Sequence, residues 1–274
     1  MPEDHRVAVI IPCGGHHGQF IAGAVQSCLD STDLPDAIIV VDDASAGFDP
    51  LPAHDILHVI MAPKHIGRSA ARNLAAKEAK TEWLFFLDAD DVLEPTALSD
   101  FRGHLDASSG RLNLLYADYD YIDADGTRCR VEKRAFEHRK IRPMPYNYFN
   151  IGMFVRRGRF IEIGGFDEDM TFGEYWDLAL RYIAAGNPPL VVKNRRPLFV
   201  ARAGSSVSPN PMKGMADATR KMQAMILGGY YDRPKPGQVI RGHRVTDIHR
   251  LVAMNKVIYE RKRAEREAAN ATCN

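Results

Sequence analysis

Short apolar runs that alternate with helix-patterned segments dominate the first hundred residues of this chain. Four such runs, rich in Ile, Val, Leu and Phe, lie at residues 7–11, 37–41, 56–61 and 83–87. Between them, segments 20–29 and 66–80 have the apolar or alanine-rich spacing of helices. Strands without a polar face belong to a largely parallel sheet that helices cover on both sides. We therefore predict an α/β fold with a mixed, mostly parallel sheet flanked by helices.

The composition is that of an ordinary globular protein that can bury a substantial core. The chain has 274 residues, 45% of them hydrophobic and 26% charged, with a net charge of +1. Its four cysteines are scattered without metal-ligand spacing, which indicates reduced thiols and not a disulfide framework. No apolar run reaches the length of a transmembrane segment, and residues 7–11 are too short for a signal-peptide core. We expect a cytoplasmic protein, with peripheral membrane association left open.

The second half of the chain has a more mixed pattern. Residues 172–185 predict a helix, because Gly186 and two prolines follow them. Short strands are expected at residues 112–116, 190–193 and 198–201. Residues 128–150 are polar, basic and contain proline, so a long connection with little regular structure is expected there.

Three carboxylates lie within four residues directly after the apolar run 83–87: Asp88, Asp90 and Asp91. Open parallel sheets bind their ligands at the carboxyl ends of the strands. Mg²⁺ and Mn²⁺ prefer oxygen ligands, and clustered carboxylates without a cation would raise one another's pKa. A helix N-cap is the structural alternative, but it would explain only one of the three. The cluster therefore predicts a divalent metal site.

A second pair of acids, Asp42 and Asp43, follows the apolar run 37–41. An acceptor fixed at a strand end could bind a nucleobase imide or a ribose hydroxyl, but a turn would also explain the pair. Arg68 and Arg72 lie near the start of the next predicted helix. They could pair with a phosphate or with the aspartates, and one of the two is expected to form a structural ion pair.

Four segments together resemble a known family. VVDDAS, HIGRSAARN, LFFLDADDVLEP and GGFDEDMTFGEYWDLALRYIAAG occur in the order and spacing typical of the inverting family 2 glycosyltransferases. The resemblance covers roughly residues 6–208 and implies the GT-A fold, a Rossmann-like nucleotide-diphospho-sugar transferase fold. It also implies a nucleoside-diphosphate sugar as donor, most often a UDP-sugar, an acceptor hydroxyl as nucleophile, and Mn²⁺ or Mg²⁺ as cofactor.

The resemblance also implies roles for individual residues. Asp42 or Asp43 would contact the base or ribose, and Asp90 and Asp91 would hold the metal. The metal would act as a Lewis acid that neutralises charge developing on the departing diphosphate. The complete set of donor-contacting positions is Pro12, Asp42, Asp43, Arg68, Asp88, Ala89 and Asp90.

An inverting transfer to a hydroxyl needs a general base, and here the chain departs from the family pattern. Many members have Glu-Asp-Trp-Asp after GGFDE, and the second residue is their usual base. This chain has Glu174-Tyr175-Trp176-Asp177, and a tyrosine titrates near 10, which makes it a poor base. Glu174 and Asp177 share a helix face and are predicted as the base in that order. Pairing of Asp177 with Arg181 is the alternative.

The domain organisation also follows from the resemblance. Residues 1–208 would form the GT-A catalytic domain, with the donor half at 1–100 and the acceptor half at 101–208. Residues 209–274 are helical by composition and would form an extension through which a homodimer could assemble.

Three basic segments suggest an anionic acceptor, although solvated faces would explain each one separately. They lie at residues 128–143, 193–196 and 241–266. A lipid-linked glycan, an anionic polymer and a nucleic acid all remain open as acceptors, as does a small hydroxylated metabolite.

Three other functions compete with transfer. Tyr175 suggests a catalytically inactive relative that binds nucleotide sugars. A nucleotidyltransferase that makes the donor would need a glycine-rich phosphate loop after the first strand, which the segment CGGHHG matches only in part. A dinucleotide-dependent oxidoreductase is disfavoured because no GxGxxG follows that strand.

Overall fold

A computed structural model describes most of the first two hundred residues. The described residues are 4–45, 47–48, 50–108, 112–122, 126–131, 152–170, 173–185, 190–192 and 197–202. The predicted C-terminal extension, its proposed dimer contact and the basic segment 193–196 lie outside them. In the part of the chain that is described, no helix combines the length and apolarity needed to cross a membrane.

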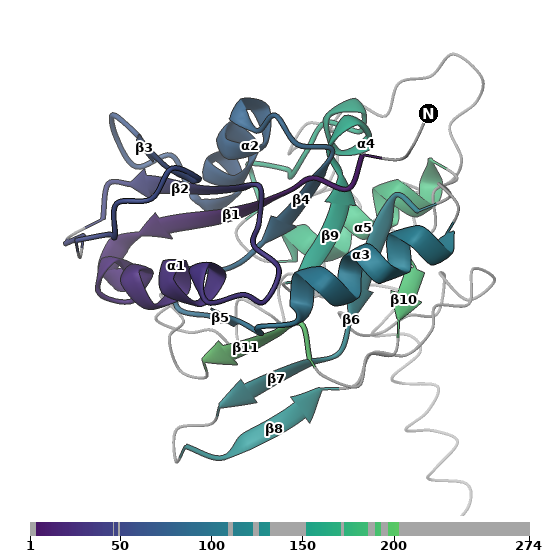
Figure 1. Ribbon diagram of the computed structural model, residues 1–274. Coiled ribbons are helices and arrows are strands. Elements are labelled where there is room, and N and C mark those ends of the chain that lie inside the picture. Colours follow the sequence, from purple (N-terminus) through teal and green to yellow (C-terminus); the bar gives the residue numbers. More distant parts are fainter. Residues whose placement is uncertain are drawn as a thin grey trace, which may run out of the picture.

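A seven-stranded sheet forms the centre of the molecule, in the order β10-β6-β9-β4-β1-β2-β3 (Figure 1). The strands are β1 (Val7–Gly14), β2 (Ala37–Asp43), β3 (Leu57–Met61), β4 (Trp83–Phe86), β6 (Leu114–Ala117), β9 (Met153–Arg156) and β10 (Leu190–Val192). Strand β9 runs antiparallel to both of its neighbours, and the other pairs in this sheet are parallel. The predicted mixed, mostly parallel sheet is therefore confirmed.

Helices cover both faces of this sheet. They are α1 (Ile21–Leu29), α2 (Arg68–Glu78), α3 (Ala97–Ser108), α4 (Arg157–Glu162) and α5 (Glu174–Ala184), with a short 3₁₀ helix η1 (Gly15–Gln19) after β1. In β1, Val7, Val9 and Ile11 share a core cluster with α1 and α3. Ala8 and Ile10 share the opposite cluster with α2, α4 and α5. Both faces of β1 are thus buried, which explains its unbroken apolar sequence.

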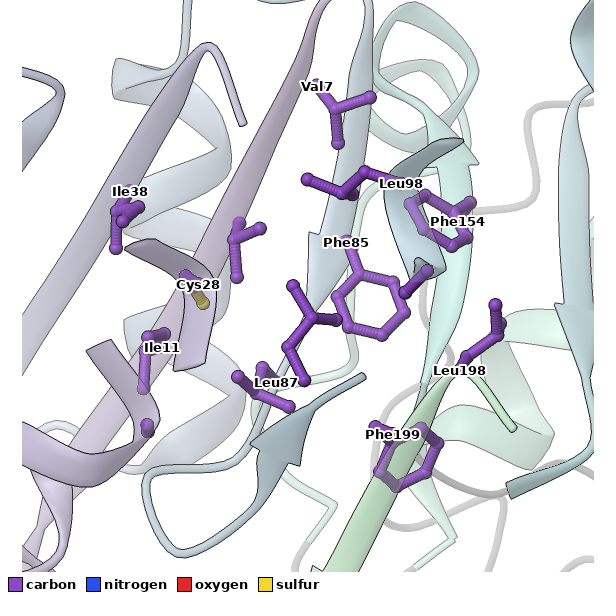
Figure 2. Close-up of a cluster of buried hydrophobic side chains, with 14 of the residues drawn as sticks. Val7, Ile11, Cys28, Ile38, Phe85, Leu87, Leu98, Phe154, Leu198 and Phe199 are labelled. Carbon is purple, nitrogen blue, oxygen red and sulfur yellow. The ribbon is translucent and has the colours of Figure 1, made fainter. Parts of the chain in front are cut away.

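The cluster beneath α1 and α3 combines aliphatic side chains with aromatic rings, among them Phe85, Phe154 and Phe199 (Figure 2). Phe154 of β9 stacks on Phe101 of α3 with ring centroids 3.8 Å apart and lies 4.4 Å from the Phe85 ring. Phe199 belongs to the same cluster, although it comes from another sheet. The core therefore joins the two sheets of the molecule.

That second sheet has the order β5-β11-β7-β8. Its strands are β5 (Val92–Leu93), β7 (Tyr119–Ile122), β8 (Arg128–Val131) and β11 (Phe199–Arg202). The expectation of little regular structure from residue 128 onward is wrong at its start, because β8 pairs antiparallel with β7. Asp120 on β7 accepts hydrogen bonds from Arg128, at 2.6 Å, and from Arg130. Opposite charges across the strands stabilise a segment that composition alone marks as irregular. Residues 132–150 lie outside the described part.

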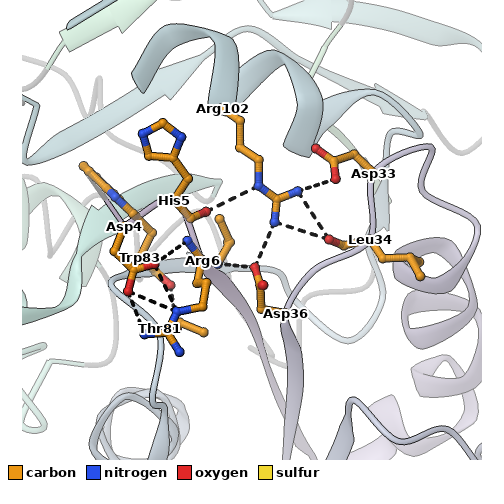
Figure 3. A network of polar contacts seen from close by, with 10 residues as sticks. Asp4, His5, Arg6, Asp33, Leu34, Asp36, Thr81, Trp83 and Arg102 are labelled. Atoms are coloured by element: carbon orange, nitrogen blue, oxygen red, sulfur yellow. Dashed lines mark hydrogen bonds and ion pairs between the residues drawn. The ribbon is translucent and has the colours of Figure 1, made fainter. Parts of the chain in front are cut away.

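A polar network at the amino-terminal edge of the sheet ties α3 to two other segments (Figure 3). Arg102 of α3 lies 2.5 Å from Asp33 and 2.8 Å from Asp36 in the connection before β2. Its Nε also donates to the His5 carbonyl oxygen at 3.3 Å. Asp36 accepts in addition from the backbone N–H of Val7 at 2.8 Å. This network therefore fixes the amino end of β1.

Arg102→Ala is expected to lower the free energy of unfolding by about 1–2 kcal/mol, because its carbonyl and carboxylate partners lose their donor. Urea denaturation of the purified chain measures the change. Arg159→Ala is the matched control, since Arg159 lies on an exposed helix surface and forms an ion pair with Glu162 three residues away, and it should stay within about 0.5 kcal/mol. Equal effects of the two substitutions would show that the network does not stabilise the fold.

Candidate functional site

The candidate site lies at the carboxyl edge of β1, β2 and β4. Cys13 and Gly14 at the end of β1 stand opposite Asp42 and Asp43 at the end of β2. Strand β4 pairs with the other side of β1, and Asp88 comes two residues after its end. The order of the strands reverses between β1 and β4, and such a switch point is where open α/β sheets bind ligands.

The two predicted aspartate clusters meet around Cys13. This thiol is buried, and burial together with the charges of Asp42 and Asp90 raises its pKa to about 12. Both carboxylates therefore act on one atom, although they are far apart in sequence. Pro12 lies in the same stretch of β1, paired with Val41 of β2.

Asp43 holds the start of α2 in place. Its Oδ1 accepts from the backbone N–H of Ile66 at 2.5 Å, and its Oδ2 accepts from that of Gly67 at 2.9 Å. His65 Nδ1 lies 2.9 Å from the same Oδ2. Asp42 Oδ1 accepts from the Ser45 N–H at 2.9 Å, as the predicted turn requires. Because backbone amides occupy both oxygens of Asp43, Asp42 is the better placed of the two to bind a ligand.

A buried arginine joins the end of β4 to the start of α5. Arg72 Nη2 donates to Asp88 Oδ1 at 2.6 Å, and Nη1 donates to Glu174 Oε1 at 3.3 Å. Its guanidinium carbon lies 4.9 Å from the Tyr175 ring centroid and 5.5 Å from that of Phe166. Burial lowers the pKa of Arg72, but the surrounding acidic groups raise it by more. Of the two arginines, Arg72 is therefore the one that forms the predicted structural ion pair, and its guanidinium is charged.

The carboxylates predicted as the general base are both bound by arginines. Besides Arg72, Glu174 is held by Arg68, with Nε 3.0 Å from Oε1 and Nη2 3.4 Å from Oε2. Asp177 is fully buried, and its Oδ2 accepts from Arg181 Nε at 2.8 Å and Nη2 at 2.6 Å. The predicted alternative for Asp177 is therefore confirmed. The assignment of Glu174 or Asp177 as base remains a prediction.

Tyr175 lies beside the ion pairs of Arg72, and its side chain is buried. Only 4% of it is exposed, and its hydroxyl has no hydrogen-bond partner among the described residues. Burial raises its pKa well above the usual value, so the hydroxyl stays protonated at neutral pH. Its ring packs edge-on against Phe166, with centroids 5.1 Å apart.

Asn73 binds α2 to the loop before α5, a role that sequence reasoning missed. Its Nδ2 donates to the Phe166 carbonyl at 2.9 Å, and its Oδ1 accepts from the Phe166 N–H at 2.8 Å. Gly165 has φ of 69°, and a Cβ there would lie 2.5 Å from Asn73 Oδ1. Only glycine suits that position. The sequence did contain a signal for this contact, because Asn73 and Gly165 both lie in segments that carry the family resemblance.

Asp90 and Asp91 are the carboxylates best suited to a metal. Both are buried, and α3 begins only at Ala97, so neither is the N-cap of a helix. No group of three His, Cys, Asp or Glu side chains placed to bind a metal occurs within the described ranges. The predicted three-carboxylate cluster is divided, because Asp88 pairs with Arg72. Two carboxylates still fit Mg²⁺ or Mn²⁺, since such ions complete their coordination with substrate phosphates and water.

Comparison with known proteins identifies the family. The model of Glycosyl transferase family 2 matches residues 8–164 of this chain. The chain belongs to this family. The uncharacterized glycosyltransferase YwdF of Bacillus subtilis (strain 168) is 30% identical over 172 residues, which cover 57% of this chain and 60% of YwdF. The pre-mycofactocin glycosyltransferase of Mycobacterium tuberculosis (strain H37Rv) is 29% identical over 164 residues, 54% of this chain and 34% of that protein. The chain thus spans less than two thirds of the length of these relatives.

Solved structures of S. aureus TarS share the fold. The complex of TarS 1-349 with UDP has a TM-score of 0.60 at 18% identity and covers 81% of this chain and 65% of TarS 1-349. The complex with UDP-GlcNAc has the same TM-score and identity and covers 81% and 66%. The predicted GT-A fold and family are therefore confirmed.

Arg72→Met is expected to destabilise the fold by about 3 kcal/mol or more, because Asp88 and Glu174 would lose their buried counter-charge. Arg68→Met should cost no more than about 1 kcal/mol, because 41% of the Arg68 side chain is exposed. Chemical denaturation of both variants tests the difference. Similar losses in the two variants would contradict the structural role of Arg72.

Proposed function

We propose that this chain is a metal-dependent inverting glycosyltransferase. It would move a sugar from a nucleoside-diphosphate sugar, with a UDP-sugar as first candidate, to an acceptor oxygen. The observation that carries the proposal is that Asp42 lies at the end of β2 and the turn Asp88–Asp91 follows β4, the two strands that flank β1 at the switch point of the sheet. TarS structures with bound UDP and UDP-GlcNAc support the choice of nucleotide, since they share this fold.

The proposed donor contacts follow the strand ends. Asp42 would bind the base or ribose, with Asp43 fixing the loop beside it. Pro12 and Ala89, both buried at that edge, would shape the pocket. Asp88 is 24% exposed even though it pairs with Arg72, so it could also accept from a ribose hydroxyl.

Asp90 and Asp91 would hold Mn²⁺ or Mg²⁺ against the donor diphosphate. A cation bound there supplies Lewis-acid stabilisation of the charge on the leaving diphosphate. The protein contributes by fixing both carboxylates in a buried turn after β4, where Asp91 N–H donates to the Asp88 carbonyl at 3.0 Å. Buried surroundings strengthen their attraction to a cation.

An inactive, nucleotide-sugar-binding relative is the second candidate. The arginine contacts of Glu174 and Asp177 and the protonated Tyr175 favour it. Incubation with nucleotide sugars, Mn²⁺ and a range of acceptors distinguishes the two. Free nucleoside diphosphate supports transfer, whereas donor binding without release supports the inactive relative.

Asp90→Ala is expected to abolish transfer and the Mn²⁺-dependent part of donor binding, because the metal pair loses one member. Calorimetric titration of donor with and without Mn²⁺, beside a turnover assay, measures both effects. Asp55→Ala is the control, since Asp55 is an exposed turn residue away from the strand carboxyl ends, and it should behave as the unmodified chain. Unchanged turnover in Asp90→Ala would refute the metal assignment.

A thermal-shift panel of nucleoside diphosphates identifies the donor base. UDP with Mn²⁺ is expected to raise the melting temperature more than ADP, GDP or CDP, and more than UDP with EDTA, because ligand binding stabilises the folded state. Another nucleotide giving the largest shift would reassign the donor. An equal shift with EDTA would argue against a metal.

A further inference from the structure

Strand β3 forms one edge of the seven-stranded sheet (Figure 1). It pairs with β2 on one side, and within the described ranges no strand pairs with its other side. At the two ends of β3, the Ile38 N–H donates to the Ile56 carbonyl, and the Ala62 N–H donates to the Asp42 carbonyl. Backbone groups along a strand alternate between its two sides. Those of residues 57, 59 and 61 therefore point to the open edge.

The side chains at this edge are apolar and exposed. Val59 is 43% and Met61 65% exposed, and Met61 is the most exposed large apolar residue in the described part of the chain. Both lie on the same face of β3 as Leu57, which packs against the cluster beneath α1 and α3. Edge strands commonly carry a lysine, a proline or a bulge that prevents pairing with another chain. Residues 57–61 contain neither lysine nor proline, and their register with β2 is uninterrupted.

Two residues of opposite charge flank the strand. Asp55 lies just before β3 and Lys64 just after it, and both are exposed. If two copies of β3 pair antiparallel, the beginning of each strand lies beside the end of the other, so Asp55 of one copy approaches Lys64 of the second. Parallel pairing would instead bring like charges together. The charges therefore favour a two-fold, antiparallel arrangement, in which the same surface serves both copies.

We infer that the open edge of β3 is a docking surface for a second copy of this chain, joined by antiparallel pairing of the two β3 strands. With Val59 on the two-fold axis, its N–H would donate to the Val59 carbonyl of the second copy, and the Met61 N–H to the Leu57 carbonyl, each in both directions. Val59 would lie opposite Val59, and Met61 opposite Leu57. Such apolar cross-strand pairs stabilise sheets, and the main-chain hydrogen bonds would join the two sheets into one.

This contact differs from the homodimer expected through residues 209–274, because it is formed by described residues of the sheet. A single edge of five residues makes a small interface, and small interfaces associate weakly. We therefore expect monomers and dimers to exchange at micromolar concentrations. All the proposed donor contacts come from one chain, so turnover per chain should not depend on association.

Sedimentation velocity of the full chain tests the inference. Between about 1 and 100 μM, the range expected for a weak interface, the mean mass should rise from that of one chain toward that of two. A chain that stays monomeric throughout would overturn the second copy as the occupant of this edge. The edge would then be left to a strand from another protein.

Val59→Lys should weaken association at least about 10-fold, because two like charges would face each other across the two-fold axis. Ile161→Lys is the matched control, since Ile161 is 46% exposed but lies on α4, and it should associate like the unmodified chain. A dimer that persists in Val59→Lys would place the contact elsewhere and overturn the inference.

A charge exchange tests the antiparallel arrangement separately. Asp55→Lys and Lys64→Glu should each weaken association about 3-fold or more, because two exposed ion pairs become repulsive. The double variant should associate like the unmodified chain, and so should an equimolar mixture of the two single variants. Both residues lie outside β3, so this test holds even if Val59→Lys disturbs the strand. No recovery in the double variant would refute the antiparallel pairing.

Discussion

The site depends on one buried guanidinium. Arg72 lies within α2, yet it contacts Asp88 after β4, Glu174 at the start of α5 and the face of Tyr175. A buried charge is tolerated only where partners compensate for its lost hydration, and removing one partner is costly. Correct placement of three distant segments is therefore a condition for burying this arginine. The energetics of the fold and the geometry of the site are thus coupled.

Helix α2 carries the residues that couple the stability of the fold to the geometry of the site. Its first turn is fixed to β2 by Asp43, which accepts two backbone N–H groups. Arg68 and Arg72 are four residues apart, so they lie on one face and reach the same Glu174. Asn73 holds the loop before α5. The spacing of Arg68, Arg72 and Asn73 along α2 therefore allows this one helix to contact three neighbouring segments.

The sequence predicted those parts of the fold that periodicity or composition controls. Strands β1, β2 and β4 are buried on both faces, so each appears as a continuous apolar run. Strand β8 was missed because Asp120 pairs with its arginines across a hairpin. Strand β9 was missed because its apolar run, Met153 to Val155, is short, and α4 because it has no such run. The strand-end position of the aspartates was predictable from neighbouring residues. The pairing of Arg72 with Glu174 was not, because 102 residues separate them.

Tyr175 links the stability of the cluster to the chemistry that the site can perform. A carboxylate at that position would be a third acid beside Arg68 and Arg72, and repulsion within such a group raises the pKa of one member. A raised pKa is what a carboxylate needs to act as a base near neutral pH. The tyrosine ring instead stabilises Arg72 through its π face and adds no charge. Tyr175 therefore packs against the buried guanidinium without adding a third carboxylate to those of Asp88 and Glu174.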